Sequence, residues 1–503
     1  MKKVLIYSFW QQGYQEACQM EAANRHLKNG DNVLLITCGS KVGFCNENIL
    51  GCKLACKSCQ KIQIRRAKKW ASDELNVQSI NDYITKEIED YANHYPFDYK
   101  DLDELKNVRF EHVEIGYGAI SSYVSYTRNI EPDMNKVRPY LDELMRMEIK
   151  SILAFKGVFK YFKPDLVIFH NGRFAHFKPI YGLAVANNVD FICTESITAS
   201  DGSIQIDNIT NNIPHDFVCR GQMFIDFYNR NKDDLSRDQV ARSFFENRRN
   251  AVFAGDTIYV KDQKKGKMPD GWQDNVENIV IFNSSEDEFF AIGSKYRDVA
   301  LFNNQLEGIK AIMGHYADDP SKHFTLRIHP HLKGLPFHYH TALYELKYPN
   351  LTVVPADSDI SSYALMDAAD KVITFGSTMG IESSYWQKPS ISVGFAFYRA
   401  LNAVYSPENV DELWELIDNK YLQPIDSKKC LPYGYYFMSN KHENFKYVKV
   451  GRARTISYMW YNFLGYNYYR VFGSVKLYNF LYFLWLHIRI YLKPFSKYAE
   501  IPQ

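Results

Sequence analysis

Short apolar runs recur along this chain, and each is closed by Gly, Ser, Asn or His before a longer helical pattern follows. The runs are Val4–Tyr7, Val33–Thr37, Leu166–Phe169, Phe191–Thr194, Ile279–Phe282, Phe324–Ile328, Leu351–Val354, Lys371–Phe375 and Ser390–Val393. Runs without polar alternation are typical of strands that are buried on both faces, as in parallel sheets covered by helices. Their alternation with helical patterns predicts an α/β protein with two Rossmann-like, doubly wound domains.

The chain has 503 residues, which is too long for one ordinary core. We expect a first domain over residues 1–265, with a helical insertion at about 61–150, and a second domain over 275–435. The segment Gly255–Asp274 is polar, contains Gly and Pro, and suits a connection between them. A C-terminal tail, 440–503, completes the chain.

The tail is the region with the most unusual composition. Between Asn444 and Ala499 there is no Asp or Glu, while Lys and Arg occur nine times among many aromatic residues. Basic residues beside Trp, Tyr and Phe are typical of a helix that lies in the membrane interface against anionic lipid. A terminal helix that packs across the two domains is the alternative, and the composition leaves both open.

Overall composition excludes several classes of protein. A hydrophobic content of 46% and a charged content of 23% are close to the globular average, which excludes a mainly disordered chain. A mean hydropathy of -0.36 and the lack of a long apolar stretch exclude a polytopic membrane protein. A net charge of +2 predicts no general attraction to nucleic acid. The first apolar run is too short for a signal peptide, so we expect a cytoplasmic protein with reduced cysteines.

Ligands of open α/β sheets bind beyond the carboxyl ends of the strands, which directs attention to three loops of the second domain. In FGSTMGIE, amides at the start of a helix near Ile381 favour an anion, Ser377 and Thr378 add hydroxyls, and Glu382 can accept from ribose hydroxyls. RIHP places a histidine beside a stiffening proline after another strand. In the third loop, NSSEDEF, Ser284 and Ser285 follow a strand. The donor-binding candidates are Ser284, Ser285, Arg327, His329, Ser377, Thr378, Gly380 and Glu382.

The first domain offers a second polar rim. HNGR follows an apolar strand and presents His170, Asn171 and Arg173, which suit a polyhydroxylated or acidic acceptor. FICTES places Glu195 after the next strand, and Glu16 lies in the first loop. Ordinary turns, caps and dipole-favoured acids explain each of these loops equally well when it is taken alone.

The loops together resemble a known family. The order SSEDEF, RIHP and FGSTMGIESSYWQKPSI is similar to the nucleotide-binding domain of GT-B-type glycosyltransferases, especially those of bacterial capsule and surface-polysaccharide biosynthesis. The resemblance covers roughly residues 1–50, 160–200 and 275–400. It implies a sugar nucleotide in the second domain, with His329, Ser377 and Thr378 at its phosphates and Glu382 at the ribose. It also implies a glycan or lipid-linked acceptor in the first domain. From the basic, aromatic tail we expect a peripheral position on the inner face of the plasma membrane.

The implied reaction is displacement of a nucleotide from an anomeric carbon by an acceptor hydroxyl. The protein must stabilise the departing phosphate and, if the configuration inverts, deprotonate the acceptor. His329 and helix N-termini are expected to serve the leaving group without a metal or other cofactor. The candidates for the base are Glu16 and Glu195.

Three rival interpretations remain open. On the same fold, the protein would be a sugar-nucleotide 2-epimerase or a polyol-phosphate transferase. The cysteines Cys45, Cys52, Cys56 and Cys59 include the spacing C-x3-C-x2-C, which predicts either a radical-SAM iron–sulfur cluster or a zinc site. Reduced, unligated thiols are the favoured alternative to a metal site. The third rival is a non-catalytic scaffold at the membrane.

Overall fold

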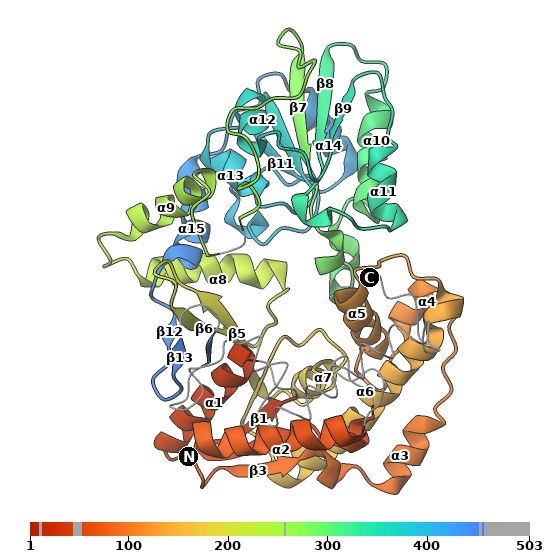
Figure 1. The fold of residues 1–503 in the computed structure, drawn as a ribbon, viewed down its shortest axis with the longest axis vertical. Coiled ribbons are helices and arrows are strands. Elements are labelled where there is room, and N and C mark those ends of the chain that lie inside the picture. The colour runs from red at the N-terminus through yellow and green to blue at the C-terminus, as the bar shows by residue number, and fades with distance from the viewer. Residues whose placement is uncertain (10–12, 44–52, 256–257, 452–454, 457–503) are drawn as a thin grey trace.

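The computed structural model describes residues 1–503 apart from 10–12, 44–52, 256–257, 452–454 and 457–503. Two α/β domains lie one above the other in Figure 1, the first below and the second above. In the described residues, each of the nine predicted apolar runs contains a strand. The predicted fold class, two Rossmann-like domains, is therefore confirmed.

The first domain is built on a seven-stranded sheet in the order β12-β6-β5-β4-β1-β2-β3. Its strands are β1 (Lys3–Ser8), β2 (Asn32–Thr37), β3 (Asn76–Ser79), β4 (Leu166–Phe169), β5 (Asp190–Thr198), β6 (Ile204–Thr210) and β12 (Glu443–Asn444). The strands β1 to β5 pair in parallel, whereas β6 runs antiparallel to β5 and β12 antiparallel to β6. The order β3-β2-β1-β4-β5 is that of a doubly wound sheet.

Helices cover both faces of this sheet. They are α1 (Gly13–Lys28), α2 (Lys53–Trp70), α3 (Lys86–Asn93), α4 (Leu102–Asn107), α5 (Ile115–Thr127), α6 (Met134–Phe162) and α7 (Lys178–Ala186). The next two helices, α8 (Phe217–Arg230) and α9 (Arg237–Arg249), lie between the two domains. The central strand β1 is apolar because it is covered on two sides, and the side chains of Val4–Tyr7 are fully buried.

The predicted helical insertion at 61–150 needs one correction. It holds α3 to α6 and most of α2, but it also contains β3, which pairs in parallel with β2 at the edge of the sheet. The prediction missed this strand because NVQS is short, polar and only partly buried, so it carries no apolar run. The insertion is therefore mainly helical, but it contributes an edge strand.

The second domain contains a five-stranded parallel sheet in the order β11-β10-β7-β8-β9. Its strands are β7 (Glu277–Phe282), β8 (Lys322–Arg327), β9 (Leu351–Val354), β10 (Lys371–Thr374) and β11 (Ser390–Ser392). Its helices are α10 (Gln305–His315), α11 (His338–Tyr344), α12 (Ser362–Ala368), α13 (Met379–Tyr385) and α14 (Val410–Asp418). Strand order reverses between β7 and β10, which places their carboxyl-end loops side by side at the topological switch point.

The two domains are joined by helices as well as by the connecting segment. After α14 the chain returns to the first domain through α15 (Leu431–Met438), which packs against α8 and α9 on the left of Figure 1. Phe224 and Phe245 share a core with Ile381 and Tyr385 of the second domain. This aromatic core fixes α8, α9 and α15 between the sheets.

The described start of the predicted tail is extended rather than helical. β12 adds to the first sheet, and β13 (Val450–Gly451) pairs with β14 (Thr455–Ile456). The backbone N–H groups of residues 446, 447 and 448 all donate to the carboxylate of Glu21 at 2.8 Å. Most of the tail lies outside the described residues. Within the described part of the chain, no helix is both long and apolar enough to cross a membrane.

Candidate functional site

A cavity of about 500 Å³ lies between the two domains and is lined by both. The second domain contributes the loops after β7, β8 and β10, and the first domain contributes the ends of β4 and β5. The predicted site residues that line this cavity are Asn171, Glu195, Ser284, Ser285, His329, Ser377 and Thr378. The structure therefore gathers candidates that lie more than 200 positions apart in the sequence.

The loop after β10 approaches the cavity with an unusual backbone. Gly376 has φ +90, and an added Cβ would lie 2.4 Å from the carbonyl oxygen of Phe395, so only glycine fits there. The Ser377 hydroxyl accepts from the N–H of Met379 at 3.2 Å. Helix α13 begins at Met379, two residues before the predicted start. The small residues Gly376, Ser377 and Thr378 thus border the cavity.

An arginine that the sequence patterns did not predict also binds the loop after β10. Arg248, on α9, donates through Nη2 to the Thr378 hydroxyl at 3.1 Å and through Nε to the Glu382 carboxylate at 3.0 Å. It lines the large cavity beside Thr378. A guanidinium at this position adds positive charge to a loop that already favours an anion.

Three predicted donor-binding residues do not line the large cavity. Glu382 is buried, and its oxygens accept from Arg248 and from the Tyr363 hydroxyl. Arg327 is buried as well, and its guanidinium donates to backbone carbonyls, including that of Ser358 at 3.1 Å. Both line a smaller adjoining cavity of about 50 Å³ that also reaches His329, Ser377 and Thr378. In the structure, both residues therefore bind protein groups.

Gly380, the third of these, is a packing position. An added Cβ would lie 2.3 Å from the hydroxyl oxygen of Tyr398 and 2.7 Å from that of Thr374. The small residue therefore lets α13 approach its neighbours, and Gly380 lines neither of the two cavities.

His329 and His331 follow β8, and His329 lines the cavity. The N–H of His331 donates to Nδ1 of His329 at 3.2 Å, and the N–H of His329 donates to the Asn283 side chain at 2.8 Å. Burial, together with the positive charges of His331, Arg327, Arg248 and Arg128, lowers the pKa of His329 to about 3. A neutral imidazole that accepts at Nδ1 carries its proton on Nε2 and is a hydrogen-bond donor there.

The two serines after β7 support these loops. The Ser284 hydroxyl donates to the carbonyl of Phe375 at 2.7 Å and accepts from the Gln305 side chain at 2.9 Å. The Ser285 hydroxyl lies 3.1 Å from Nδ1 of His331. The acids that follow form a short 3₁₀ turn, Glu286–Glu288.

On the first-domain side, two carboxyl groups lie together on one face of the sheet. Glu195 on β5 is directly opposite Asp207 on β6 in the antiparallel pair. Asp207 is bound by Arg220 at 3.0 Å and by the Tyr436 hydroxyl, and these partners lower its pKa. Burial raises the pKa of Glu195 to about 8, and the charge of Asp207 acts in the same direction. The Glu195 side chain is 22% exposed and lines the cavity.

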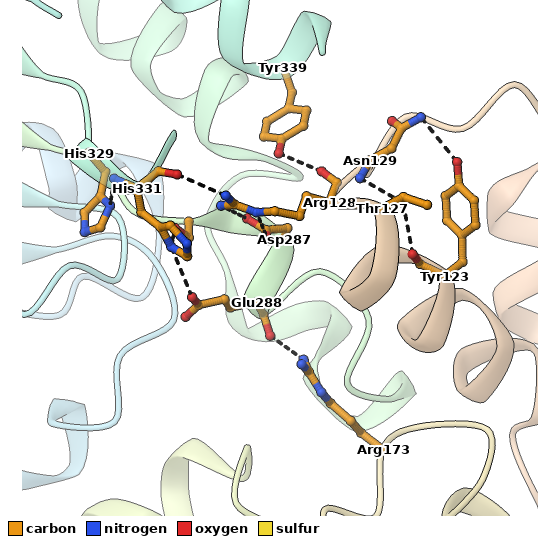
Figure 2. Close-up of polar contacts among 11 residues, drawn as sticks. Tyr123, Thr127, Arg128, Asn129, Arg173, Asp287, Glu288, His329, His331 and Tyr339 are labelled. Atoms are coloured by element: carbon orange, nitrogen blue, oxygen red, sulfur yellow. Dashed lines mark hydrogen bonds and ion pairs between the residues drawn. The ribbon is translucent and has the colours of Figure 1, made fainter. Parts of the chain in front are cut away.

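The HNGR residues differ in whether they line the cavity. Asn171, with φ 62, lines the cavity. His170 does not line the cavity, and its Nδ1 is 3.1 Å from the carbonyl oxygen of Thr194. Burial lowers the pKa of His170 to about 4. Arg173 is buried and donates to the carbonyl of Glu288 in the second domain, so it joins the domains (Figure 2).

Glu16, the other candidate base, lies away from the large cavity. It is buried on α1, where Arg66 of α2 forms an ion pair with it. Burial raises the pKa of Glu16, although Arg66 opposes this effect. It is not among the described residues that line the cavity. Of the two candidates, only Glu195 therefore faces the space between the domains.

The cysteine motif is only partly described. Cys56 and Cys59 lie on α2 and are partly exposed, whereas Cys45 and Cys52 lie outside the described residues. Among the residues that the structure describes, no group of three or more His, Cys, Asp or Glu side chains is placed to hold a metal ion.

Comparison with known proteins adds the following findings. No protein-family model and no curated protein matches the chain. The solved structures that it resembles include KpsC of Thermosulfurimonas dismutans, a beta Kdo 2,7 transferase, with 14% identity, 56% of this chain and 79% of that chain covered, and a TM-score of 0.31. The calicheamicin glycosyltransferase CalG4 shares 13% identity over 87% of this chain and 94% of its own, with a TM-score of 0.25.

An epimerase is also among the similar structures. UDP-GlcNAc 2-epimerase of Methanocaldococcus jannaschii shares 11% identity over 86% of this chain and 98% of its own, with a TM-score of 0.23. The solved structures that this chain resembles thus include a Kdo transferase, a glycosyltransferase and an epimerase.

Proposed function

We propose that this protein is a glycosyltransferase that moves a sugar from a nucleotide-sugar donor to a growing surface glycan of capsule or lipopolysaccharide type. One observation carries the proposal. A carboxyl group with a raised pKa, Glu195, and a phosphate-suited set, His329, Ser377 and Thr378, line the same cavity from opposite domains. That arrangement suits a reaction in which one domain holds the leaving group and the other activates the acceptor.

The leaving phosphate is stabilised by groups of the second domain and α9. The Ser377 and Thr378 hydroxyls, Nε2–H of His329 and the Arg248 guanidinium are all donors. Preorganised donors and positive charge stabilise negative charge most where water is excluded. The chain's own groups therefore supply the leaving-group stabilisation in this proposal.

The acceptor is activated from the first domain. In an inverting transfer, the acceptor oxygen attacks the anomeric carbon, the bond from that carbon to the phosphate oxygen breaks, and the acceptor proton passes to Glu195. A carboxylate with a pKa of about 8 is a much stronger base than an ordinary glutamate, because burial disfavours its charged form. Asn171 and Ser196 lie beside Glu195 on the acceptor side of the cavity.

A membrane partner is proposed for the tail. The segment from residue 444 to 499 is free of acidic residues and rich in aromatic ones, which suits contact with an anionic membrane surface. Removal of residues after Ile456 keeps the contacts of 446–448 with Glu21 and tests this directly. A truncated protein that stays with the membrane fraction would contradict the proposal.

The enzymatic proposal is tested by following donor and acceptor separately. Labelled CMP, UDP and GDP sugars are incubated with the protein, with and without a membrane glycan extract from the producing cells. Transfer of label to glycan that depends on the extract supports a glycosyltransferase. Conversion of the sugar to its 2-epimer without the extract would contradict it and favour an epimerase on the same fold.

A further inference from the structure

One first-domain arginine reaches across to the loop that carries His329. Arg128 caps the C-terminal end of α5 with φ 62 and extends from the first domain into the second (Figure 2). Its Nε lies 3.0 Å from Oδ2 of Asp287, and its Nη2 lies 3.3 Å from Oδ1 of the same carboxylate. Such a two-pronged contact fixes the orientation of both groups.

The third donor of the same guanidinium binds the histidine loop itself. Nη1 of Arg128 donates to the backbone carbonyl of His331 at 3.0 Å. The N–H of His331 in turn donates to Nδ1 of His329 at 3.2 Å. Two hydrogen bonds, both made by the backbone of His331, therefore connect Arg128 to the His329 imidazole that lines the cavity.

The arginine is itself held firmly. The Tyr339 hydroxyl donates to the carbonyl of Arg128 at 2.8 Å, and this tyrosine belongs to the second domain. On the first-domain side, the Thr127 hydroxyl donates to the carbonyl of Tyr123 at 2.9 Å and accepts from the N–H of Asn129 at 3.2 Å. Figure 2 shows these contacts on both sides of Arg128, so its side chain can transmit the relative position of the domains.

We propose that Arg128 is a positioning residue that couples the arrangement of the two domains to the hydrogen-bonding state of His329. With the domains as they are in the structure, Arg128 holds the 329–331 turn so that the backbone N–H of His331 occupies Nδ1 of His329. The proton then remains on Nε2, which is the donor for the phosphate of the sugar nucleotide. This last step rests on the proposed function, whereas the effect on the imidazole does not.

A second arginine provides a matched control. Arg109 also joins the domains, because its Nη2 lies 3.1 Å from the Ser294 hydroxyl and 2.8 Å from Glu114. Its contacts do not involve the 329–331 turn. Replacement of Arg109 therefore removes another interdomain arginine contact without touching His329.

The test compares Arg128→Gln with Arg109→Gln in the full chain. The first readout is the nitrogen spectrum of ¹⁵N-histidine-labelled protein, in which His329→Ala identifies the signal of His329. The second is the affinity for CMP and for UDP, each measured alone by calorimetry. We expect Arg128→Gln to move the His329 signals from a single Nε2–H tautomer to a mixture, and to weaken binding of the nucleotide that the wild type prefers at least fivefold. Arg109→Gln should leave the tautomer unchanged and the affinity within twofold.

Two results would overturn the inference: an unchanged His329 tautomer in Arg128→Gln, or an equal change in both variants. If the wild type binds neither nucleotide, the proposed function fails, but the tautomer readout still decides the inference. Should Arg128→Gln not fold, Asp287→Asn, which takes away the partner charge, must shift the His329 signals in the same direction. No shift in that folded variant would equally contradict the coupling.

Discussion

The two walls of the interdomain cavity are built in different ways. The second-domain wall consists of short loops that directly follow β7, β8 and β10, so each functional group lies within a few residues of a buried strand. The first-domain wall brings together Glu195, Asp207 and Arg220 from β5, β6 and α8. The first-domain wall, the packed wall, thus depends on tertiary packing. The second-domain wall, the loop wall, follows largely from local sequence.

The largest expected effect is on stability and concerns the packed wall. Arg220→Met leaves the buried carboxylate of Asp207 without its ion-pair partner, so we expect a loss of about 3–5 kcal/mol in the free energy of unfolding. Denaturant unfolding measures it. The exposed pair between Lys156 and Glu111 is the control, and Lys156→Met should cost less than about 1 kcal/mol. Equal losses in both variants would show that the packed wall has no special role.

The next prediction concerns the chemistry of the same wall. Glu195→Gln keeps the shape of the side chain but removes the proposed base, so we expect transfer to fall by a factor of about 100 or more with nucleotide affinity unchanged. The rate of transfer to the glycan extract is the measurement. Glu288→Gln removes an exposed carboxylate from the same cavity and should change the rate less than about threefold. A Glu195→Gln enzyme with the wild-type rate would assign the base elsewhere.

The pH dependence sharpens this prediction. A base with a pKa of about 8 is ionised only above that pH, so kcat/KM should rise about tenfold per pH unit below pH 7 and level off above pH 8. The same raised pKa means that the folded protein binds a proton that the unfolded chain releases at about pH 4.5. Glu195 should therefore destabilise the fold increasingly as the pH rises from about 4.5 to 8. Unfolding of wild type and Glu195→Gln across this range measures the difference, and parallel curves would contradict the shift.

A smaller effect is expected on the loop wall, where several donors share the phosphate. His329→Ala should lower transfer at least tenfold, about 1.4 kcal/mol of barrier, with the fold intact. Glu382→Ala should lower transfer by a similar factor, but through Arg248, which then loses the carboxylate that orients it. Steady-state kinetics with circular dichroism measures rate and fold together. Wild-type turnover in both variants would contradict the assignment of this wall.

The sequence predicted the loop wall better than the packed wall, for a physical reason. In a parallel sheet the carboxyl ends of the strands share one edge, so the positions of Ser285, His329 and Ser377 after apolar runs are enough to group them. Asp207 and Arg220 carry no such signal, because β6 runs antiparallel and α8 approaches from outside the sheet. Glu195 was found only because it follows an apolar run.

Sequence patterns also missed Arg248, Arg128 and β3, each for a different reason. Arg248 lies on an amphipathic helix that looks like an ordinary surface element, and its role depends on the packing of α9 against α13. Arg128 depends on the relative position of two domains. The strand β3 lacks an apolar run because it is a polar edge strand. The nine predicted strands, by contrast, were evident because each coincides with a continuous apolar run.

The most direct test of the central claim is a thermal-shift screen of CMP, CDP, UDP and GDP sugars. Binding to the folded state raises Tm by mass action. If the cavity holds an activated sugar, at least one nucleotide sugar should raise the Tm of the wild type, and the shift should largely disappear in a protein carrying both His329→Ala and Thr378→Val. If no nucleotide sugar shifts the wild type, or if the double variant responds as strongly, the cavity is not the donor site.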